Sequence, residues 1–308
     1  MHILLSTLAT LSTFVSLCES VKKPGQRVCI IGAGPSGLTA CKEMLAAGLE
    51  PTLFEQTDQV GGNWVYREET SHSSVYNCTR IDNSKHILAF SDFPPPSDFP
   101  HFCSHRLILA YLNQYVDHFG FRGRIAFNTR VESCSPVGTT GWRVVTSSNG
   151  TRQEHDFDAL LVCNGHHNVP RTPREFTETA FKGQLLHSHS YKRPDPFKKK
   201  KVVVIGVGNS GVDIACDVSH EAEMVYLSTR SGAYVLPKMV GSKPIDFALT
   251  QLSYMLPWRF LFLLSLFTIL FFKVLFLTQH PEPHHEFDVL LDCGEHGRGL
   301  ASPQAKGI

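Results

Sequence analysis

Apolar positions between residues 27 and 55 follow a strand pattern, then a helix pattern, then a strand pattern again. Residues 28–31 form a continuous run of strand-forming side chains, which predicts a strand buried on both faces. Beyond it, apolar residues recur at helical spacing until Gly48 ends the helix: Leu38, Ala40, Cys41, Met44 and Leu45. A second apolar run covers residues 51–54. The pattern therefore predicts a strand–helix–strand unit.

A glycine-rich turn joins the first predicted strand to the helix. Its glycines, Gly32, Gly34 and Gly37, permit a tight turn, close approach of backbone N–H groups to a pyrophosphate, and close packing of helix on strand. Glu55 ends the second strand, 23 residues after Gly32, where its carboxylate can accept hydrogen bonds from both ribose hydroxyl groups. A lone GxGxxG also occurs in ordinary turns, but here strand, glycines, helix and acid occur in register. We therefore predict a dinucleotide-binding unit.

The same pattern returns after residue 201. An apolar run is followed by the turn Gly206-Val207-Gly208-Asn209-Ser210-Gly211, a helix pattern, and a strand pattern that ends at residue 228. Arg230 has the place that Glu55 has in the first unit, and a guanidinium there suits a 2′-phosphate. The first unit thus favours a ribose diol and the second NADP. Two nucleotide sites of different preference indicate electron transfer between FAD and NADPH.

The composition is that of a globular chain. Its 308 residues are 42% hydrophobic with a net charge of +1, enough for one large or two medium domains and no reason to expect nucleic acid. The chain has nine cysteines, and no two of them stand in a CxxC spacing. Cys29, Cys163 and Cys216 fall within predicted strands or helices, so buried thiols are favoured over disulfides or metal ligands.

Further elements are predicted between the two units. We expect an amphipathic helix at 106–119, a buried strand from residue 157, and an antiparallel patch formed by residues 125–127, 142–146 and the run after Glu154. His166 and His167 follow the strand and are interpreted as hydrogen-bonded loop residues, with metal ligation as the alternative. The turn Gly61-Gly62-Asn63-Trp64 lets backbone pass close to a flat ring system.

Both ends of the chain are strongly apolar. Residues 1–20 resemble a secretory signal peptide, with an uncleaved anchor as the alternative, and the sequons at Asn77 and Asn149 are compatible with a lumenal chain. Residues 256–277 are apolar on every side and would span about 33 Å as a helix, so we predict membrane association, with a buried core helix as the alternative. In the tail, a metal site is considered and not favoured: His284, His285, Cys293 and His296.

The segment directly upstream of the second glycine turn carries Phe181, Gly183, His187 and Tyr191 in the spacing FxGxxxHxxxY. This spacing resembles the fingerprint of the flavin-containing monooxygenases, whereas the related Baeyer–Villiger enzymes carry Trp-Pro where this chain has Tyr191-Lys192. The resemblance covers about residues 26–255. It extends to four further stretches, at residues 61–64, 91–94, 162–167 and 228–232.

The resemblance implies an α/β fold with two Rossmann-type dinucleotide-binding domains, for FAD and NADPH, the flavin domain being incomplete. The implied organisation is a signal peptide or anchor at 1–20, an FAD-binding domain at 26–170, an NADPH-binding domain with the linker fingerprint at 171–255, a membrane-associated segment at 256–277 and an irregular tail at 278–308. Family members are roughly twice as long, and their returning flavin-domain strand has no counterpart after Gly241.

The implied function is NADPH- and O2-dependent oxygenation of soft nitrogen or sulfur nucleophiles through a flavin hydroperoxide, of the N,N-dimethylaniline monooxygenase type. Expected partners are an amine or sulfide substrate, molecular oxygen and a membrane, but no nucleic acid. The expected location is the endoplasmic reticulum membrane or lumen, with secretion as the alternative. Two other interpretations stay open: a catalytically incompetent, truncated nucleotide-binding fragment, and a two-nucleotide flavin reductase, which would use a redox-active cysteine pair.

The implied cofactor contacts lie in and beside the glycine turns. For FAD they are Gly32, Ala33, Gly34, Pro35, Ser36, Gly37, Glu55, Gly62, Asn63 and Trp64. For NADPH they are Gly206, Gly208, Asn209, Ser210, Gly211, Asp213 and Arg230. In the fingerprint, His187 is expected to lie near the nicotinamide, and Phe181, Gly183 and Tyr191 are expected to serve in packing.

The catalytic position departs from the family pattern. Family members carry an asparagine near the flavin six residues after a tyrosine, and counting from Tyr76 places Asp82 there, with Asn83 next to it. An ionised carboxylate cannot donate the hydrogen bond that an amide donates, and it repels an anionic reduced flavin. Asp82 therefore predicts poor coupling of NADPH consumption to product, unless a one-residue shift lets Asn83 serve.

Overall fold

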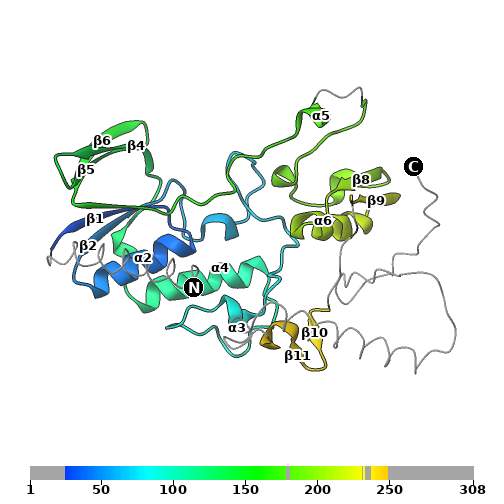
Figure 1. Ribbon diagram of the computed structural model, residues 1–308, viewed down its shortest axis with the longest axis horizontal. Helices are drawn as coiled ribbons and strands as arrows, with labels where there is room; N and C mark the ends of the chain where they lie inside the picture. Colours follow the sequence, from blue (N-terminus) through cyan, green and yellow to red (C-terminus); the bar gives the residue numbers. More distant parts are fainter. Residues whose placement is uncertain (1–24, 178–180, 231, 233–236, 249–308) are drawn as a thin grey trace, which may run out of the picture. The chain divides into compact units, whose positions relative to one another are not determined.

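The computed structural model describes residues 25–177, 181–230, 232 and 237–248 (Figure 1). The predictions for residues 1–20, 256–277 and the tail lie outside the described residues. The chain divides into two compact units. The first comprises the described residues up to Arg80 with Ser91–Phe99 and Cys103–Lys192, and the second comprises Ile81–Phe90, Pro100–Phe102 and the described residues from Arg193.

A four-stranded parallel sheet lies at the centre of the first unit, in the order β3-β2-β1-β7. Strand β1 (Arg27–Ile31) pairs in parallel with β2 (Glu50–Phe54) on one side and with β7 (Ala159–Val162) on the other. Helix α2 (Pro35–Ala46) connects β1 to β2. The apolar run at 28–31 predicted this strand, and its three central residues are fully buried.

An antiparallel sheet covers one face of the parallel sheet, with α2 on the other side (Figure 1). It consists of β4 (Arg130–Val137), β5 (Gly141–Ser148) and β6 (Thr151–Phe157). Cys29 and Phe54 of the parallel sheet pack against Val144 and Phe157 of the antiparallel one. Removing these apolar surfaces from water stabilises the contact between the two sheets.

The predicted antiparallel patch is wrong in one member. Strand β3 (Ile125–Ala126) pairs in parallel with β2, with Leu53 opposite Ile125, and so extends the central sheet. Ile125 is buried there, and Asn128 then turns the chain with a positive φ of 50° before β4 begins. A two-residue strand carries no alternation, so its partner could not be inferred from its pattern.

The remaining elements of the first unit are mostly short. Helix α4 (His105–His118) matches the predicted amphipathic helix to within one residue, and it buries Ile108, Leu112 and Val116. The others are the α-helix α5 (Arg174–Thr177) and the 3-10 helices η1 (Gly62–Trp64), η2 (Arg122–Arg124) and η3 (Ser188–Ser190).

The second unit contains the second strand–helix–strand. Strands β8 (Lys201–Ile205) and β9 (Met224–Ser228) pair in parallel, and α6 (Asn209–Ser219) connects them. Val203, Ile205 and Tyr226 are 59%, 58% and 54% exposed. The unit also holds α3 (Lys85–Leu88), the pair β10 (Met239–Val240) and β11 (Lys243–Pro244), and the 3-10 helices η4 (Asp195–Phe197) and η5 (Ile245–Ala248).

None of the seven cysteines in the described part of the chain is in a disulfide. Burial raises the pKa of the Cys29 thiol to about 12 and that of Cys41 to about 11. Cys163 and Cys216 are half-buried rather than buried. The expectation of buried thiols therefore holds for Cys29 and in part for the other two.

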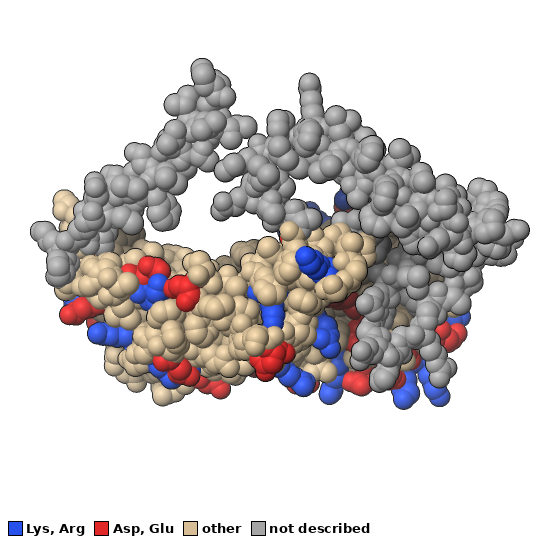
Figure 2. Space-filling model, turned by 90° about the horizontal axis from the view of Figure 1, so that it is seen from below, with Lys and Arg blue, Asp and Glu red and all other residues tan. Residues whose placement is uncertain are grey.

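Charges of both signs lie interspersed among uncharged side chains on the face shown in Figure 2. Within the described ranges, no helix is long and apolar enough to cross a membrane.

Candidate functional site

The first glycine turn brings three backbone segments into direct contact. Gly32 has a φ of +100°, and a Cβ added to it would lie 2.6 Å from the carbonyl oxygen of Cys163, just beyond β7. A Cβ on Gly37 would overlap the carbonyl oxygen of Gly32. Glycine is therefore required at both positions, by conformation at the first and by space at both.

The N-terminus of helix α2 is open to a ligand. Gly34 is the N-cap and supplies no side-chain hydrogen bond, and Pro35 follows as the first helical residue. The first-turn N–H groups of a helix have no partner within the helix, and with the helix dipole they attract anions. The turn is therefore shaped for a phosphate or pyrophosphate group.

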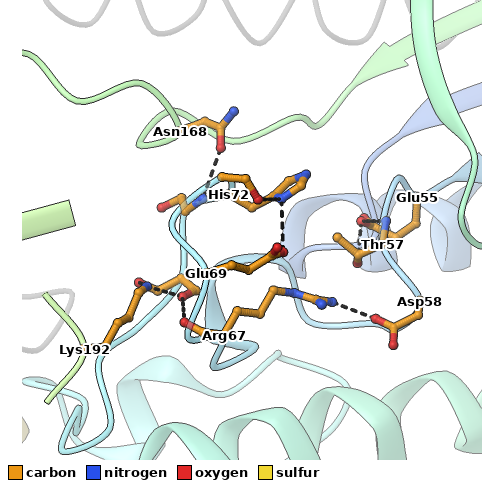
Figure 3. A network of polar contacts seen from close by, with 11 residues as sticks. Glu55, Thr57, Asp58, Arg67, Glu69, His72, Asn168 and Lys192 are labelled. Carbon is orange, nitrogen blue, oxygen red and sulfur yellow. Dashed lines mark hydrogen bonds and ion pairs between the residues drawn. The ribbon is translucent and has the colours of Figure 1, made fainter. Parts of the chain in front are cut away.

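Glu55 is buried, 6% exposed, at the end of β2. Its Oε2 accepts a hydrogen bond from Ala33 N at 2.8 Å, and its Oε1 accepts from both the N–H and the hydroxyl of Thr57 at 2.8 Å (Figure 3). A carboxylate offers about four acceptor positions, so these three donors leave one. One hydroxyl of a ribose diol can use the remaining position, and the second can bind Glu55 only by sharing or replacing one of these contacts.

The turn at residues 61–64 lies against the glycine turn. Gly61 N donates to Ala33 O at 3.0 Å, and a Cβ on Gly62 would lie 3.0 Å from the Cα of Gly34. Asn63 is exposed and Trp64 is half-buried beside them. The structure thus brings together the sequence-predicted residues of the first site, from the glycine turn, the end of β2 and this turn.

A polar network continues from this turn through residues that the sequence did not single out (Figure 3). The Arg67 guanidinium lies 2.7 Å from Asp58 and lowers the pKa of that carboxyl. Ser74 accepts from the Lys192 ammonium, and burial lowers the pKa of Lys192. No motif spans these residues, so only the run of three charged residues at 67–69, followed by serines at 71, 73 and 74, could have drawn notice.

The second glycine turn repeats the geometry of the first. Gly206 has a φ of +107°, and a Cβ on Gly211 would overlap the Gly206 carbonyl oxygen. Gly208 is the N-cap of α6 without a side-chain bond. Asn209, Ser210 and Arg230 are exposed, and Asp213 is half-buried. The predicted residues of the second site therefore surround the N-terminus of α6 and the end of β9.

The candidate catalytic residues lie in the second unit. Asp82 and Asn83 are both exposed, and the Lys238 ammonium lies 3.7 Å from Asp82 Oδ1. In the first unit, His187 Nδ1 accepts from His189 N at 3.1 Å. His166 and His167 are exposed with ring centroids 3.8 Å apart, and the described residues contain no cluster of three or more potential metal ligands. The tail histidines lie outside the described residues.

Residues 25–262 match the flavin-binding monooxygenase-like family. The chain belongs to this family. It is 43% identical over 222 residues to dimethylaniline monooxygenase [N-oxide-forming] 2 of Pan troglodytes, a match that covers 70% of this chain and 42% of that protein. The chain spans between 42% and 44% of the length of these curated relatives.

Solved structures agree with the two-site α/β fold. The S-allyl-L-cysteine S-oxygenase of Allium sativum superposes with a TM-score of 0.64 at 28% identity, covering 72% of this chain and 55% of that one. The structure of OTEMO in complex with FAD and NADP superposes with a TM-score of 0.56 at 25% identity, covering 73% and 44%. The predicted fold class, with two Rossmann-type domains, is thereby confirmed.

Gly37→Ala should destabilise the first unit. The new methyl group would overlap the Gly32 carbonyl oxygen, and overpacking against backbone costs about 3 kcal/mol. Urea unfolding followed by tryptophan fluorescence measures the loss. Gly123→Ala is the matched control, because nothing lies within 4 Å of its Cβ, and its change should stay within about 1 kcal/mol. Equal stability of the two variants would show that the close approach is not a constraint.

Proposed function

We propose that the chain acts as a flavin-dependent monooxygenase that binds FAD at the first glycine turn and NADPH at the second. The observation that carries the proposal is that the same turn geometry occurs in both units, with opposite charges after their second strands. The first unit has a buried Glu55 there, and the second has an exposed Arg230. An acid at this position accepts from a ribose diol, whereas a guanidinium pairs with a 2′-phosphate. Family membership supports the same assignment.

FAD fits the residues of the first turn. The uncapped N-terminus of α2 would receive its pyrophosphate, Glu55 its ribose, and Asn63 and Trp64 would border its ring. FAD, when bound there, would supply the redox chemistry by which NADPH and O2 oxygenate the substrate. The protein's part is to orient the two nucleotides and to exclude water.

The second turn would hold NADPH in the same way. The N-terminus of α6 faces the phosphates without a side-chain cap, and Arg230 would pair with the 2′-phosphate. The substrate class that we propose is a soft amine or sulfide. Its support lies in the two proteins named above, one an N-oxide-forming enzyme and the other an S-oxygenase.

The thiols favour this function over a disulfide-linked flavin reductase. A redox-active cysteine requires a lowered pKa, because the thiolate is the reacting form. Burial instead raises the pKa of Cys29, Cys41 and Cys163. A truncated fragment that binds nucleotide without catalysis is the other alternative. The flavin experiment below separates this fragment from a catalytically active chain.

We further propose the secretory pathway as the location. The support is the apolar N-terminal segment, together with the sequon at Asn149, which lies exposed at the tip of the β5–β6 hairpin. Peptide-N-glycosidase should lower the apparent mass of the cell-expressed chain, and Asn149→Gln should reduce that shift. A chain that carries no glycan argues against a lumenal location.

Flavin binding and reduction test the function directly. The purified chain should quench the fluorescence of added FAD, and anaerobic NADPH should then bleach the visible absorbance of the bound flavin. Binding without bleaching supports the non-catalytic fragment. Absence of any binding contradicts the proposal.

Arg230→Ala should weaken NADPH binding and leave NADH binding unchanged. Loss of one charge-assisted contact to phosphate costs about 1.5–3 kcal/mol, which is roughly ten- to hundredfold in affinity. The matched control is Lys201→Ala, which removes a cation at the opposite end of the same two-stranded sheet. If the NADPH/NADH preference is the same in both variants, Arg230 does not select the cofactor.

Asp82→Asn should lower the hydrogen peroxide released per NADPH consumed, whereas Asn83→Ala should change it little. The amide can donate the hydrogen bond that the carboxylate cannot. The Lys238 ammonium offsets the Asp82 charge only weakly, because an exposed ion pair contributes about 0–1 kcal/mol. The opposite pattern, with leakage rising only in Asn83→Ala, would assign the catalytic position to Asn83.

A further inference from the structure

Lys192 is a buried lysine that belongs to neither glycine turn. The residue is 6% exposed, and its Nζ lies 2.5 Å from Ser74 Oγ and 3.4 Å from Ser74 O. Burying an ammonium is costly unless hydrogen bonds replace its water. Burial lowers the pKa of Lys192, in agreement with this cost. The buried ammonium is thus tied to Ser74, with the charge of Glu68 nearby, so the role of Lys192 depends on what the segment around Ser74 holds.

The segment around Ser74 is fixed from both sides. The backbone of Lys192 adds a second contact, because its carbonyl oxygen accepts from Asn77 N at 2.9 Å. On the N-terminal side, Ser73 N donates to Asn168 Oδ1 at 3.1 Å. Figure 3 shows Lys192 and Asn168 reaching this segment from different parts of the chain. The linker that carries the fingerprint thus holds residues 73–77.

The same segment holds Asn63 by two bonds. Ser73 Oγ donates to Asn63 Oδ1 at 2.8 Å, and Val75 N donates to Asn63 O at 3.0 Å. Asn63 belongs to the turn that packs against Gly34 of the first glycine turn. A continuous set of contacts therefore runs from Lys192 through residues 73–75 to the border of the first nucleotide site.

We propose that Lys192 is a positioning residue that holds residues 73–75 and, through them, Asn63 and Trp64 beside the first glycine turn. It thereby raises the affinity of the first site for its dinucleotide. The identity of that ligand as FAD rests on the proposed function, whereas the positioning rests on the contacts alone.

A purely local packing role is the competing explanation. Tyr191, next to Lys192, is buried and its ring meets that of Tyr76 edge to face at 5.8 Å between centroids. This contact stabilises the linker whatever Lys192 does. The experiment must therefore report on residues 73–75 and on the first site, and not on stability alone.

The first measurement is amide hydrogen exchange in the chain without added cofactor. Lys192→Met keeps the apolar stem and removes the ammonium, and Ser74→Ala removes its acceptor hydroxyl. Both variants should speed amide exchange across residues 66–76 about tenfold, because each removes one charge-assisted hydrogen bond that holds this segment. The double variant should add little, because both changes remove the same contact. Unchanged exchange in Lys192→Met overturns the proposal.

The second measurement is the affinity of each nucleotide site. Lys192→Met should raise the Kd for FAD about tenfold and leave the Kd for NADPH unchanged, and Lys192→Arg should recover most of the loss. Lys182→Met, an exposed lysine of the same linker, is the matched control and should change neither. An unchanged Kd for FAD, or equal losses at both sites, overturns the proposal. Failure of the unaltered chain to bind FAD contradicts the proposed function instead, and the exchange measurement then decides the role of Lys192.

Discussion

The absence of side chains at Gly32 and Gly37 is the constraint on which the first unit depends. It lets helix α2 and the end of β7 approach the same turn without an intervening Cβ. Gly32 N also donates to Phe54 O at 2.8 Å, so the turn fixes the end of β2 as well. Glu55 follows Phe54 directly and is thereby placed within 2.8 Å of Ala33 N. The position of the acid is thus a consequence of backbone packing.

The second unit uses the same turn with less support around it. A Cβ on Gly206 would meet nothing within 4 Å, whereas one on Gly32 meets the chain beyond β7. Each of its two described sheets, β8-β9 and β10-β11, has two strands, a size that is marginal on its own in water. Val203, Ile205 and Tyr226 leave a large part of their apolar surface exposed. Burial of these three side chains against another apolar surface would therefore stabilise the second unit.

The sequence predicted those parts of the fold and the site that are encoded locally. Glycine spacing and apolar periodicity gave β1, α2, β8 and α6, because each of these depends on neighbours within one turn or one strand. The parallel pairing of β3 with β2 could not be inferred, since two residues carry no period. Lys192 was missed because its partner Ser74 lies 118 positions away and no spacing rule links them.

Opposite charges at the ends of β2 and β9 imply different physical means of selecting a nucleotide. Glu55 is buried and already accepts three hydrogen bonds, so a 2′-phosphate there would place a second negative charge beside the carboxylate. On the proposed assignment, selection at the first site would work by repulsion at a buried position. Arg230 is exposed, so on the same assignment it would attract a phosphate in a solvated place and would have to be ordered on binding. Because salt screens exposed charges far more than buried ones, raising the ionic strength should weaken selection at the second site and leave the first almost unchanged.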